Sequence, residues 1–496
     1  MTTISGETGN MKDLWGDLGN GFYKNPVLNA DYSDPDVIRV GDDFYMVCSD
    51  FHYMGIPVLH SKDLINWTII GQVYDRLDIH GRYDGMDGYG KGSWAPAIKY
   101  HDGQFYIYFC TPDEGLYMSS AADAAGPWTQ LHEVRRVAGW EDPCPFWDDD
   151  GNAYLGHSIL GAGPIIIHRM SPDGRQLLDD GVIVYIGKIA EGTKIYKRKQ
   201  YYYLVIPEGG VEKGWQTVAR AKDIYGPYER KVVLQTGRTN INGPHQGGLV
   251  ELESGETWFM HFQSTGALGR VCHLQPVNWV DDWPVMGEEG EPVSICRKPD
   301  VGRNYPAALP QSSDQFDQKK LGYQWQWNHN PVDENWSLDI RPGYMCLTAM
   351  KAENVLKARN TLTQKLMGAK STMTAELSIH NMQSGQRAGL TYLCAREENW
   401  IGVVKNGDSC RIEAVTAGVR YHGPVIRGTE VWFKTTLDIL SDTFFYFSID
   451  GINYFQLGGS CTICGGFWKG VRIGLFSYNT ESSGGRADFK SFLRQA

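Results

Sequence analysis

The chain has 496 residues, a formal net charge of −11 and no cluster of lysine and arginine, which excludes a basic surface for nucleic acid or anionic membranes. The N-terminus lacks an apolar segment behind basic residues, and no later stretch approaches about 18 apolar residues, so we expect a cytoplasmic protein that does not enter a membrane. Aromatic residues at 12% and 58 glycines favour an all-β fold with many turns.

Residues 1–24 are polar and form a predicted lead-in to a repeating region at residues 25–298. This region contains one pattern five times, at intervals of roughly 50 residues. Each copy has a distinctive polar or aromatic residue, a strand, a tight turn, and a second strand that carries an aromatic, and the fullest copy spans residues 140–158. Strand-rich repeats of this length indicate a five-bladed β-propeller, in which about four antiparallel strands make each blade. The leading residues of the copies are Asp34, Trp94, Asp142, Glu191 and His245.

The innermost strand of each propeller blade faces a central channel. If each leading residue opens that strand, the five side chains converge at one end of the channel. A single acid before proline or glycine is usually a turn residue without chemistry. Three carboxylates at corresponding positions of separate repeats instead favour a shared site, and the set as a whole suggests one that cleaves sugars.

The chain changes character after the repeats. Residues 75–92, within the repeating region, are rich in glycine and acids, and we expect them to form a loop at the channel mouth. Prolines punctuate residues 299–314, which predicts an extended linker. Residues 315–496 lack the repeat and contain short alternating strands, which indicates a C-terminal β-sandwich. This sandwich is expected to bind carbohydrate, to stabilise the propeller, or to form a wall of the sugar pocket.

The ten cysteines are dispersed through apolar strand patterns, which predicts buried free thiols rather than a disulfide framework. Cys461 and Cys464 form a single C-x-x-C pair with no second pair and no neighbouring histidine. Zinc sites use four ligands, so we do not expect a zinc site here.

Several segments together resemble glycoside hydrolase family 43, the β-xylosidases and α-L-arabinofuranosidases, in the branch with a C-terminal concanavalin-like (jelly-roll) sandwich. The resemblance covers nearly the whole chain after residue 20. Its strongest parts are KNPVLNADYSDPDVIRVGDDFYMVCS from residue 24, VLHSKDLINW from residue 58, SWAPAIKY from residue 93, EDPCPFWDDDGNAYL from residue 141, EGTKIYKR from residue 191, GPHQGG from residue 243 and the run at residues 270–276.

The resemblance implies a role for each of five residues. Asp34 corresponds to the general base, Asp142 to the acid that orients and tunes the catalytic acid, and Glu191 to the general acid. His245 corresponds to a histidine that contacts a channel metal through water, here expected to be a structural or activating calcium ion. Arg270 corresponds to an arginine that reaches the sugar. A core histidine and a structural arginine are the alternatives for the last two.

Three further residues are expected to line the sugar pocket. Trp94 offers an apolar ring face on which a pentose can lie, and Phe51 and His52 are expected at its border. Glu141 departs from the family pattern, because xylosidases of a related branch carry an apolar aromatic just before the tuning aspartate. This departure leaves the preference between xylose and arabinofuranose open.

The expected chemistry is hydrolysis with inversion, which places the two catalytic carboxyl groups about 6.5–9.5 Å apart. An unperturbed glutamate titrates near pH ~4.3, so the general acid needs a raised pKa to stay protonated. We expect repulsion from Asp142 to raise the pKa of Glu191. This chemistry requires no cofactor.

The predicted activity is exo-acting release of β-D-xylose from the non-reducing ends of xylo-oligosaccharides, with or without α-L-arabinofuranosidase activity. The expected partners are xylo-oligosaccharides or arabinose-substituted hemicellulose fragments, with no nucleic acid and no membrane. The alternatives are an enzyme acting mainly on arabinofuranose side chains and a propeller that binds glycans without cleaving them. The presence of Asp34, Asp142 and Glu191 favours an enzyme over a binding protein.

Overall fold

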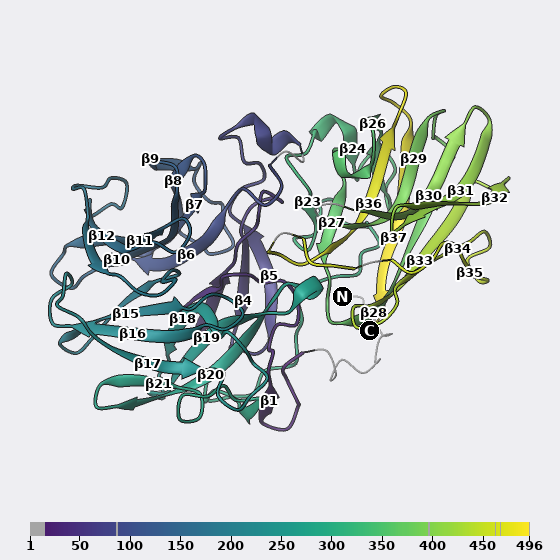
Figure 1. The fold of residues 1–496 in the computed structure, drawn as a ribbon. Helices are drawn as coiled ribbons and strands as arrows, with labels where there is room; N and C mark the ends of the chain where they lie inside the picture. The colour runs from purple at the N-terminus through teal and green to yellow at the C-terminus, as the bar shows by residue number, and fades with distance from the viewer. Residues whose placement is uncertain (1–14, 86–87, 395–396, 462, 467, 496) are drawn as a thin grey trace.

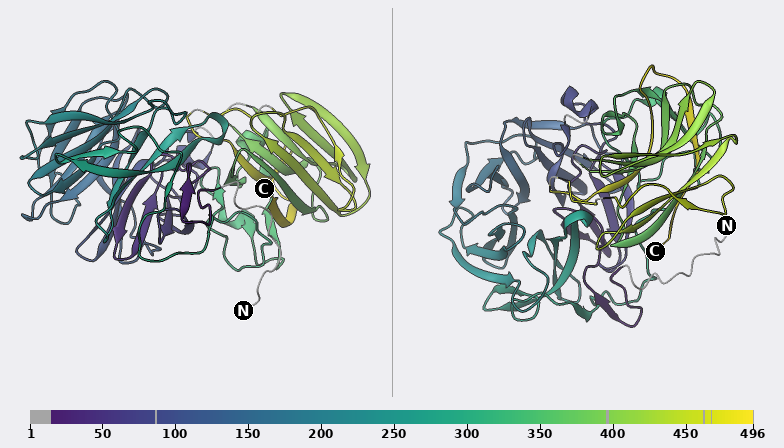
Figure 2. Two further views of the ribbon diagram at one scale, coloured as in Figure 1. Left: turned by 90° about the horizontal axis from the view of Figure 1, so that it is seen from below. Right: turned by 45° about the vertical axis from the view of Figure 1, so that its right-hand side comes forward.

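The computed structural model describes residues 15–85, 88–394, 397–461, 463–466 and 468–495. Two β domains lie side by side, a propeller built from the first part of the chain and a sandwich built from the last (Figures 1 and 2). The only helices in these described ranges are short 3-10 turns, and none could cross a membrane. The predicted all-β fold class, a five-bladed propeller followed by a concanavalin-like sandwich, is confirmed.

Each propeller blade is a separate sheet of four antiparallel strands that pair in sequence order. In every blade the first strand is innermost and the hairpin turn follows it, as the repeat predicted. The blades consist of β2 (Asp36–Val40), β3 (Asp43–Val47), β4 (Pro57–Ser61) and β5 (Trp67–Gln72); β6 (Trp94–His101), β7 (Gln104–Thr111), β8 (Gly115–Ala121) and β9 (His132–Arg136); β10 (Trp140–Trp147), β11 (Ala153–Ile159), β12 (Ile165–Met170) and β13 (Val182–Tyr185); β14 (Lys194–Arg198), β15 (Tyr201–Glu208), β16 (Trp215–Ala221) and β17 (Glu229–Gln235); and β18 (His245–Glu251), β19 (Thr257–Ser264), β20 (Arg270–Val280) and β21 (Trp283–Met286).

The segment before the first blade ties the two ends of the propeller together. β1 (Phe22–Lys24) pairs with β22 (Ile295–Arg297), which follows the fifth blade. Across the same seam, the backbone N–H of Val27 donates to the carbonyl oxygen of Cys272 in β20 at 2.8 Å. Within the predicted lead-in, Trp15 is buried. These contacts place the acids that follow, at residues 31–36, against the fifth blade.

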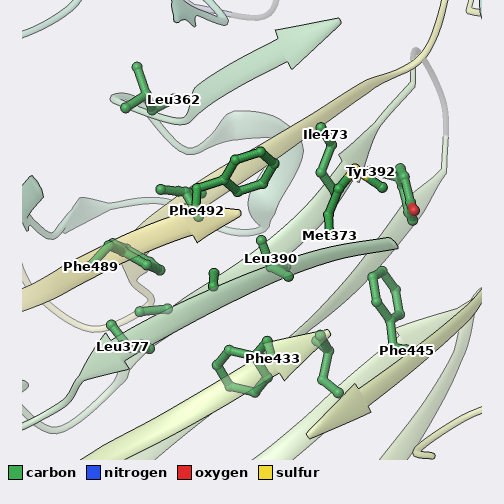
Figure 3. Close-up of a cluster of buried hydrophobic side chains, with 14 of the residues drawn as sticks. Leu362, Met373, Leu377, Leu390, Tyr392, Phe433, Phe445, Ile473, Phe489 and Phe492 are labelled. Atoms are coloured by element: carbon green, nitrogen blue, oxygen red, sulfur yellow. The ribbon is translucent and has the colours of Figure 1, made fainter. Parts of the chain in front are cut away.

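The sandwich consists of two packed sheets, and some of its strands alternate between buried and less buried side chains. In β33, for example, Val431, Phe433 and Leu437 are buried in the sandwich core, and Figure 3 shows Phe433 within it. This period of two residues is what buries one face of each sheet. The first sheet contains β23 (Gln326–Trp327), β27 (Leu362–Lys365), β36 (Arg472–Asn479), β29 (Gln386–Leu393), β30 (Glu398–Asn406), β31 (Ser409–Thr416) and β32 (Val419–Ile426), with β26 (Met350–Lys351) beside β36, and the second contains β24 (Trp336–Ser337), β25 (Met345–Thr348), β37 (Arg486–Gln495), β28 (Lys370–Ser378), β33 (Glu430–Asp438), β34 (Phe444–Ser448) and β35 (Phe455–Gln456).

The two domains are joined by polar contacts as well as by the chain between them. Gln311, in the predicted linker, accepts from the backbone N–H of Ile69 in the first blade at 3.2 Å. The glycine-rich loop at residues 75–92 also reaches the sandwich, because the backbone N–H of Leu77 donates to Asn330 Oδ1 at 2.8 Å.

All ten cysteines lie within the described part of the chain, and none forms a disulfide there. Seven are buried, as expected, whereas Cys296 and Cys410 are partly exposed and Cys464 is exposed.

Candidate active site

The innermost strands of four blades carry the same backbone distortion at the end where they begin. Asp34, Ala95, Asp142 and Gly192 have φ angles of 53°, 42°, 56° and 59°. Positive φ is uncommon outside glycine, and aspartate tolerates it better than most residues. Repetition of the distortion in separate blades shows that these four residues hold corresponding places in the repeat. Non-glycine residues held in this way cluster at functional sites.

This correspondence corrects the expectation that the five leading residues are equivalent. Trp94 and Glu191 lie one residue before the distorted position, and Glu141 holds the same earlier position in the third blade. His245 opens β18 next to Gln246, whose Nε2 atom lies 3.4 Å from Asp142 Oδ1. Asp34 and Asp142 therefore occupy the distorted position, whereas Glu191 precedes it, so the three predicted catalytic residues do not hold one equivalent position.

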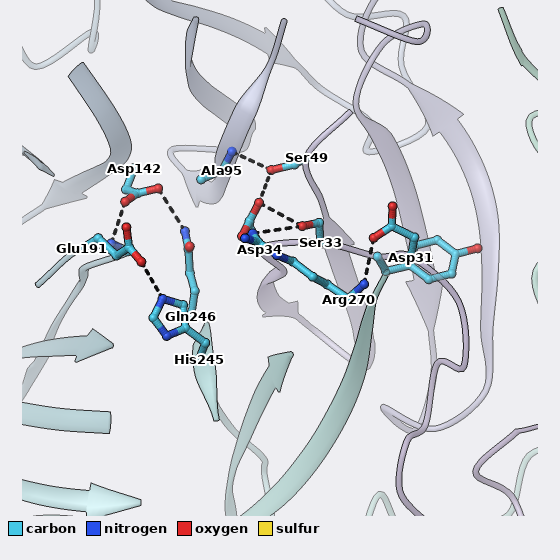
Figure 4. A network of polar contacts seen from close by, with 12 residues as sticks. Asp31, Ser33, Asp34, Ser49, Ala95, Asp142, Glu191, His245, Gln246 and Arg270 are labelled. Atoms are coloured by element: carbon cyan, nitrogen blue, oxygen red, sulfur yellow. Dashed lines mark hydrogen bonds and ion pairs between the residues drawn. The ribbon is translucent and has the colours of Figure 1, made fainter. Parts of the chain in front are cut away.

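Asp34 is the buried centre of the first group of polar contacts. Its Oδ1 atom accepts from Arg270 Nη1 at 2.6 Å, and its Oδ2 atom accepts from the hydroxyls of Ser49 and Ser33. Ser49 in turn accepts from the backbone N–H of Ala95 in the second blade at 2.7 Å. Figure 4 shows this chain of contacts from the fifth blade to the second. It fixes the direction of the Asp34 carboxylate and gives it a positive partner.

Asp142, Glu191 and His245 form the second group, beside the first (Figure 4). His245 Nε2 donates to Glu191 Oε1 at 2.7 Å. Asp142 Oδ2 accepts from the backbone N–H of Gly192 at 2.7 Å and from Ser158 Oγ at 3.0 Å. Asp142 thereby holds the peptide that follows Glu191, which fits the orienting role that the resemblance implied.

Glu141 adds a third carboxyl group to the second cluster. Ligand atoms of Glu141, Asp142 and Glu191 all lie within 4.8 Å of one another. Burial, followed by the charges of Asp142 and Glu191, raises the pKa of Glu141 to about 9. Burial and then Glu191 raise the pKa of Asp142 to about 6, with a further contribution from Asp34. The cluster therefore retains a proton at neutral pH, on Glu141.

The pKa of Glu191 moves in the opposite direction. Burial alone would raise it, but the hydrogen bond from His245 and the positive charges of His245 and Arg270 together lower it. The expectation that the pKa of Glu191 is raised is therefore wrong for the substrate-free site, because the contact with His245 and the charge of Arg270 outweigh burial.

An aromatic cluster flanks the Asp34–Arg270 pair, and one of its rings comes from the sandwich. Trp468 packs edge-on against Phe51, with ring centroids 3.9 Å apart, and against Trp94, with centroids 5.0 Å apart. The Arg270 guanidinium carbon lies 4.2 Å from the centroid of the Trp468 ring. The two predicted rings are thus brought together, and the sandwich contributes a third.

His52 is adjacent to this cluster but contacts other groups. Its ring stacks on Tyr53, with centroids 5.4 Å apart, and packs against Tyr83 at 5.9 Å. Burial, followed by the charge of Lys469, keeps the pKa of His52 well below its usual value, so the ring is neutral. The described contacts of His52 join it to the glycine-rich loop, not to the carboxylates.

Two residues of this site were missed in the sequence. Trp468 lies far from the repeats, in a segment without a distinctive pattern, so no sequence signal pointed to it. Glu141 stood out only as a departure from the family, although its adjacency to Asp142 and its place in the repeat one residue before the distortion could have identified it.

Two sets of side-chain atoms at this end of the channel would bind a metal ion, the first directly and the second through water. The three carboxyl groups of Glu141, Asp142 and Glu191 supply the hard oxygen ligands that calcium prefers. The Nδ1 atom of His245 is buried and has no hydrogen-bond partner within the described ranges. A water molecule bound to a nearby ion would supply that partner. The residues present therefore fit a cation.

Comparison with known proteins gives consistent matches to both domains. The model of Glycosyl hydrolases family 43 matches residues 23–284, and the model of the Beta xylosidase C-terminal Concanavalin A-like domain matches residues 313–494. A protein of Xylanibacter ruminicola, provisionally named a β-xylosidase, is 51% identical over 475 residues, which cover 93% of this chain and 88% of that protein. A β-xylosidase of Formosa agariphila is 35% identical over an alignment of 547 positions that covers 96% of this chain and 91% of that protein.

A solved structure described as a bifunctional GH43-CE protein of Bacteroides eggerthii has a TM-score of 0.86 at 30% identity. The match covers 97% of this chain but only 64% of that longer one. The similarity therefore extends over both β domains described above, including the channel end where the carboxyl groups meet. On these grounds the chain belongs to glycosyl hydrolases family 43.

Proposed function

We propose that the protein is an exo-acting, inverting glycosidase that releases β-D-xylose from the non-reducing ends of xylo-oligosaccharides. The observation that carries the proposal is the meeting of Asp34 with the Asp142–Glu191 pair, from three different blades, at one end of the channel. The β-xylosidase names of the two relatives support xylose as the sugar. Short xylo-oligosaccharides and arabinose-substituted hemicellulose fragments are the substrates that fit this activity.

In the proposed reaction Asp34 is the general base. Its carboxylate takes a proton from a water molecule, which attacks the anomeric carbon from the face opposite the leaving group. Arg270 holds Asp34 Oδ1 and, through its remaining N–H groups, is in place to donate to a sugar hydroxyl. The rings of Trp94 and Trp468 offer the apolar surface on which a pentose packs.

Glu191 is the general acid: its protonated carboxyl group gives a proton to the leaving oxygen. His245 Nε2 lies 2.7 Å from Glu191 Oε1 and holds the carboxyl group in place. Asp142 orients Glu191 through the backbone N–H of Gly192, which donates to Asp142 Oδ2 at 2.7 Å.

A calcium ion is proposed as a structural or activating partner rather than as a reactant. His245 would reach it through a water molecule at Nδ1, and the carboxyl cluster would supply negative charge. When bound, the ion would add positive charge that stabilises the ionised form of the cluster.

The activity is tested with the p-nitrophenyl glycosides of β-D-xylose and α-L-arabinofuranose, and with xylobiose. We expect faster turnover of the xyloside and, by proton NMR, an initial product of inverted anomeric configuration. Faster turnover of the arabinofuranoside would favour the rival substrate. Binding of xylo-oligosaccharides without turnover of any of these substrates would indicate a glycan-binding propeller instead.

A further inference from the structure

Asp31 joins the sandwich to the propeller beside the candidate active site. Its Oδ1 atom accepts from the backbone N–H of Arg270 at 2.9 Å, and its Oδ2 atom accepts from the backbone N–H of Gly470 at 2.8 Å. Arg270 belongs to the fifth blade and Gly470 to the segment that leads into β36 of the sandwich. One carboxylate, 4% exposed, therefore bonds to two domains at once. Figure 4 shows the first of these bonds.

The backbone around Asp31 leaves room for the carboxylate only because two neighbours are glycines. A Cβ atom at Gly269, where φ is +88°, would lie 2.4 Å from Asp31 Oδ1. A Cβ atom at Gly470 would lie 2.7 Å from the carbonyl oxygen of Leu268 and 3.1 Å from Asp31 Cβ. The sandwich segment thus approaches the turn between β19 and β20 more closely than a side chain would allow.

Every residue of the segment 468–470 has a partner on the propeller. Trp468 lies over Arg270 and against Phe51, as described above. The buried Nζ atom of Lys469 lies 3.5 Å from the ring centroid of Tyr53 and 4.0 Å from that of Tyr89. Gly470 bonds to Asp31. The segment is therefore held at three successive positions.

We propose that Asp31 is a positioning residue of the catalytic centre, which sets Trp468 and Arg270 at the sugar site by bonding to the backbone of both their segments. This inference rests on the proposed function. It makes the sandwich a working part of the sugar site, because the alignment of the Arg270–Asp34 pair depends on a bond that also holds the sandwich.

The test is Asp31→Asn, which keeps the shape of the side chain but replaces one accepting oxygen with a donor that faces an N–H group. We expect kcat/KM for p-nitrophenyl β-xyloside to fall by about tenfold or more, the size expected for a lost bond to a charged group. The loss should include a rise in KM, which a smaller folded fraction alone would not cause. An unchanged KM and kcat/KM would overturn the proposal.

Asp63→Asn is the matched control. Asp63 is 3% exposed and accepts from the backbone N–H groups of Ile65 and Asn66 within the first blade, at 3.0 and 2.8 Å. Its described contacts do not include the sandwich. We expect this variant to lose stability while its KM stays within about twofold of the wild type.

A double-mutant cycle separates positioning from general weakening. In a Trp468→Ala background, Asp31→Asn should lower kcat/KM by a smaller factor than it does in the wild type, because one of the two groups that it positions, the Trp468 ring, is already gone. If the double variant loses kcat/KM by the full product of the two single-variant factors, the proposal is contradicted. Gly470→Ala provides a second approach that leaves Asp31 intact, and it should reproduce the rise in KM because its Cβ atom pushes the segment away from Asp31.

The outcomes distinguish this inference from the proposed function. A wild-type protein that cleaves neither glycoside refutes the function. A wild-type protein that cleaves the xyloside, together with an Asp31→Asn variant of unaltered KM, refutes only the positioning role.

Discussion

Glu141→Gln tests whether the carboxyl cluster holds a proton at neutral pH. The amide mimics the protonated acid and retains an oxygen that accepts from the backbone N–H of Ala162, as Glu141 Oε1 does at 3.2 Å. If Glu141 is already neutral at pH 7, the variant should keep kcat/KM within about fivefold of the wild type. A larger loss would mean that the enzyme uses the ionised form.

The effect on stability follows from the pKa of Glu141, about 9 in the folded protein against 4.5 for an unperturbed glutamate. Between these values the folded protein holds a proton that the unfolded chain releases, so the wild type loses stability as pH rises through this window. Each pH unit costs about 1.4 kcal/mol. The accumulated cost is about 3 kcal/mol at pH 7 and about 6 kcal/mol above pH 9.

Glutamine carries no such cost, so the variant should gain on the wild type as pH increases. Urea unfolding of both proteins at pH 4, 7 and 9 measures the difference. We expect nearly equal stability at pH 4, an advantage of about 3 kcal/mol for the variant at pH 7, and a wider gap at pH 9. Stability curves that run parallel across this range would refute the assignment of the proton to Glu141.

Three other substitutions test the proposed roles. Glu191→Ala should lower kcat/KM for xylobiose by about 10³-fold, with a smaller loss on an aryl xyloside whose leaving group needs no proton; equal losses on both would remove Glu191 from the acid role. Asp34→Ala should be at least as damaging, and added azide should not restore turnover, whereas azide rescue that gives a glycosyl azide of inverted configuration, together with a wild-type sugar product of retained configuration, would indicate a nucleophile instead of a base. Trp468→Ala should raise KM for xylobiose by about tenfold while kcat changes less, because a stacking ring is lost, and steady-state kinetics with KM unchanged would place the ring outside the sugar site.

The repeat predicted the propeller because each blade is a local structure. A strand, a turn and a second strand are specified by alternating side chains and turn residues that lie next to each other in the chain. The alternation in residues 315–496 predicted the sandwich for the same reason. The leading residues Asp34, Asp142 and Glu191 were found because equivalent ends of equivalent strands must meet at one end of the channel.

Other features of the site depend on contacts between distant parts of the chain. The pKa of Glu191 is lowered because His245, from another blade, donates a hydrogen bond to it, a contact that the spacing of the acids did not reveal. Glu141 holds a proton because three carboxyl groups are buried together, and burial is a property of the assembled blades.

The order of residues thus determined the blades, the sandwich and the acids at the channel end, since these follow from periodicity within short segments. Only the tertiary structure decided which acid keeps its proton and that Trp468 and Asp31 join the sandwich to the sugar site. The reason is physical: desolvation and interdomain contact depend on which segments pack together, and residues 31, 270 and 468–470 become neighbours only after both domains have folded.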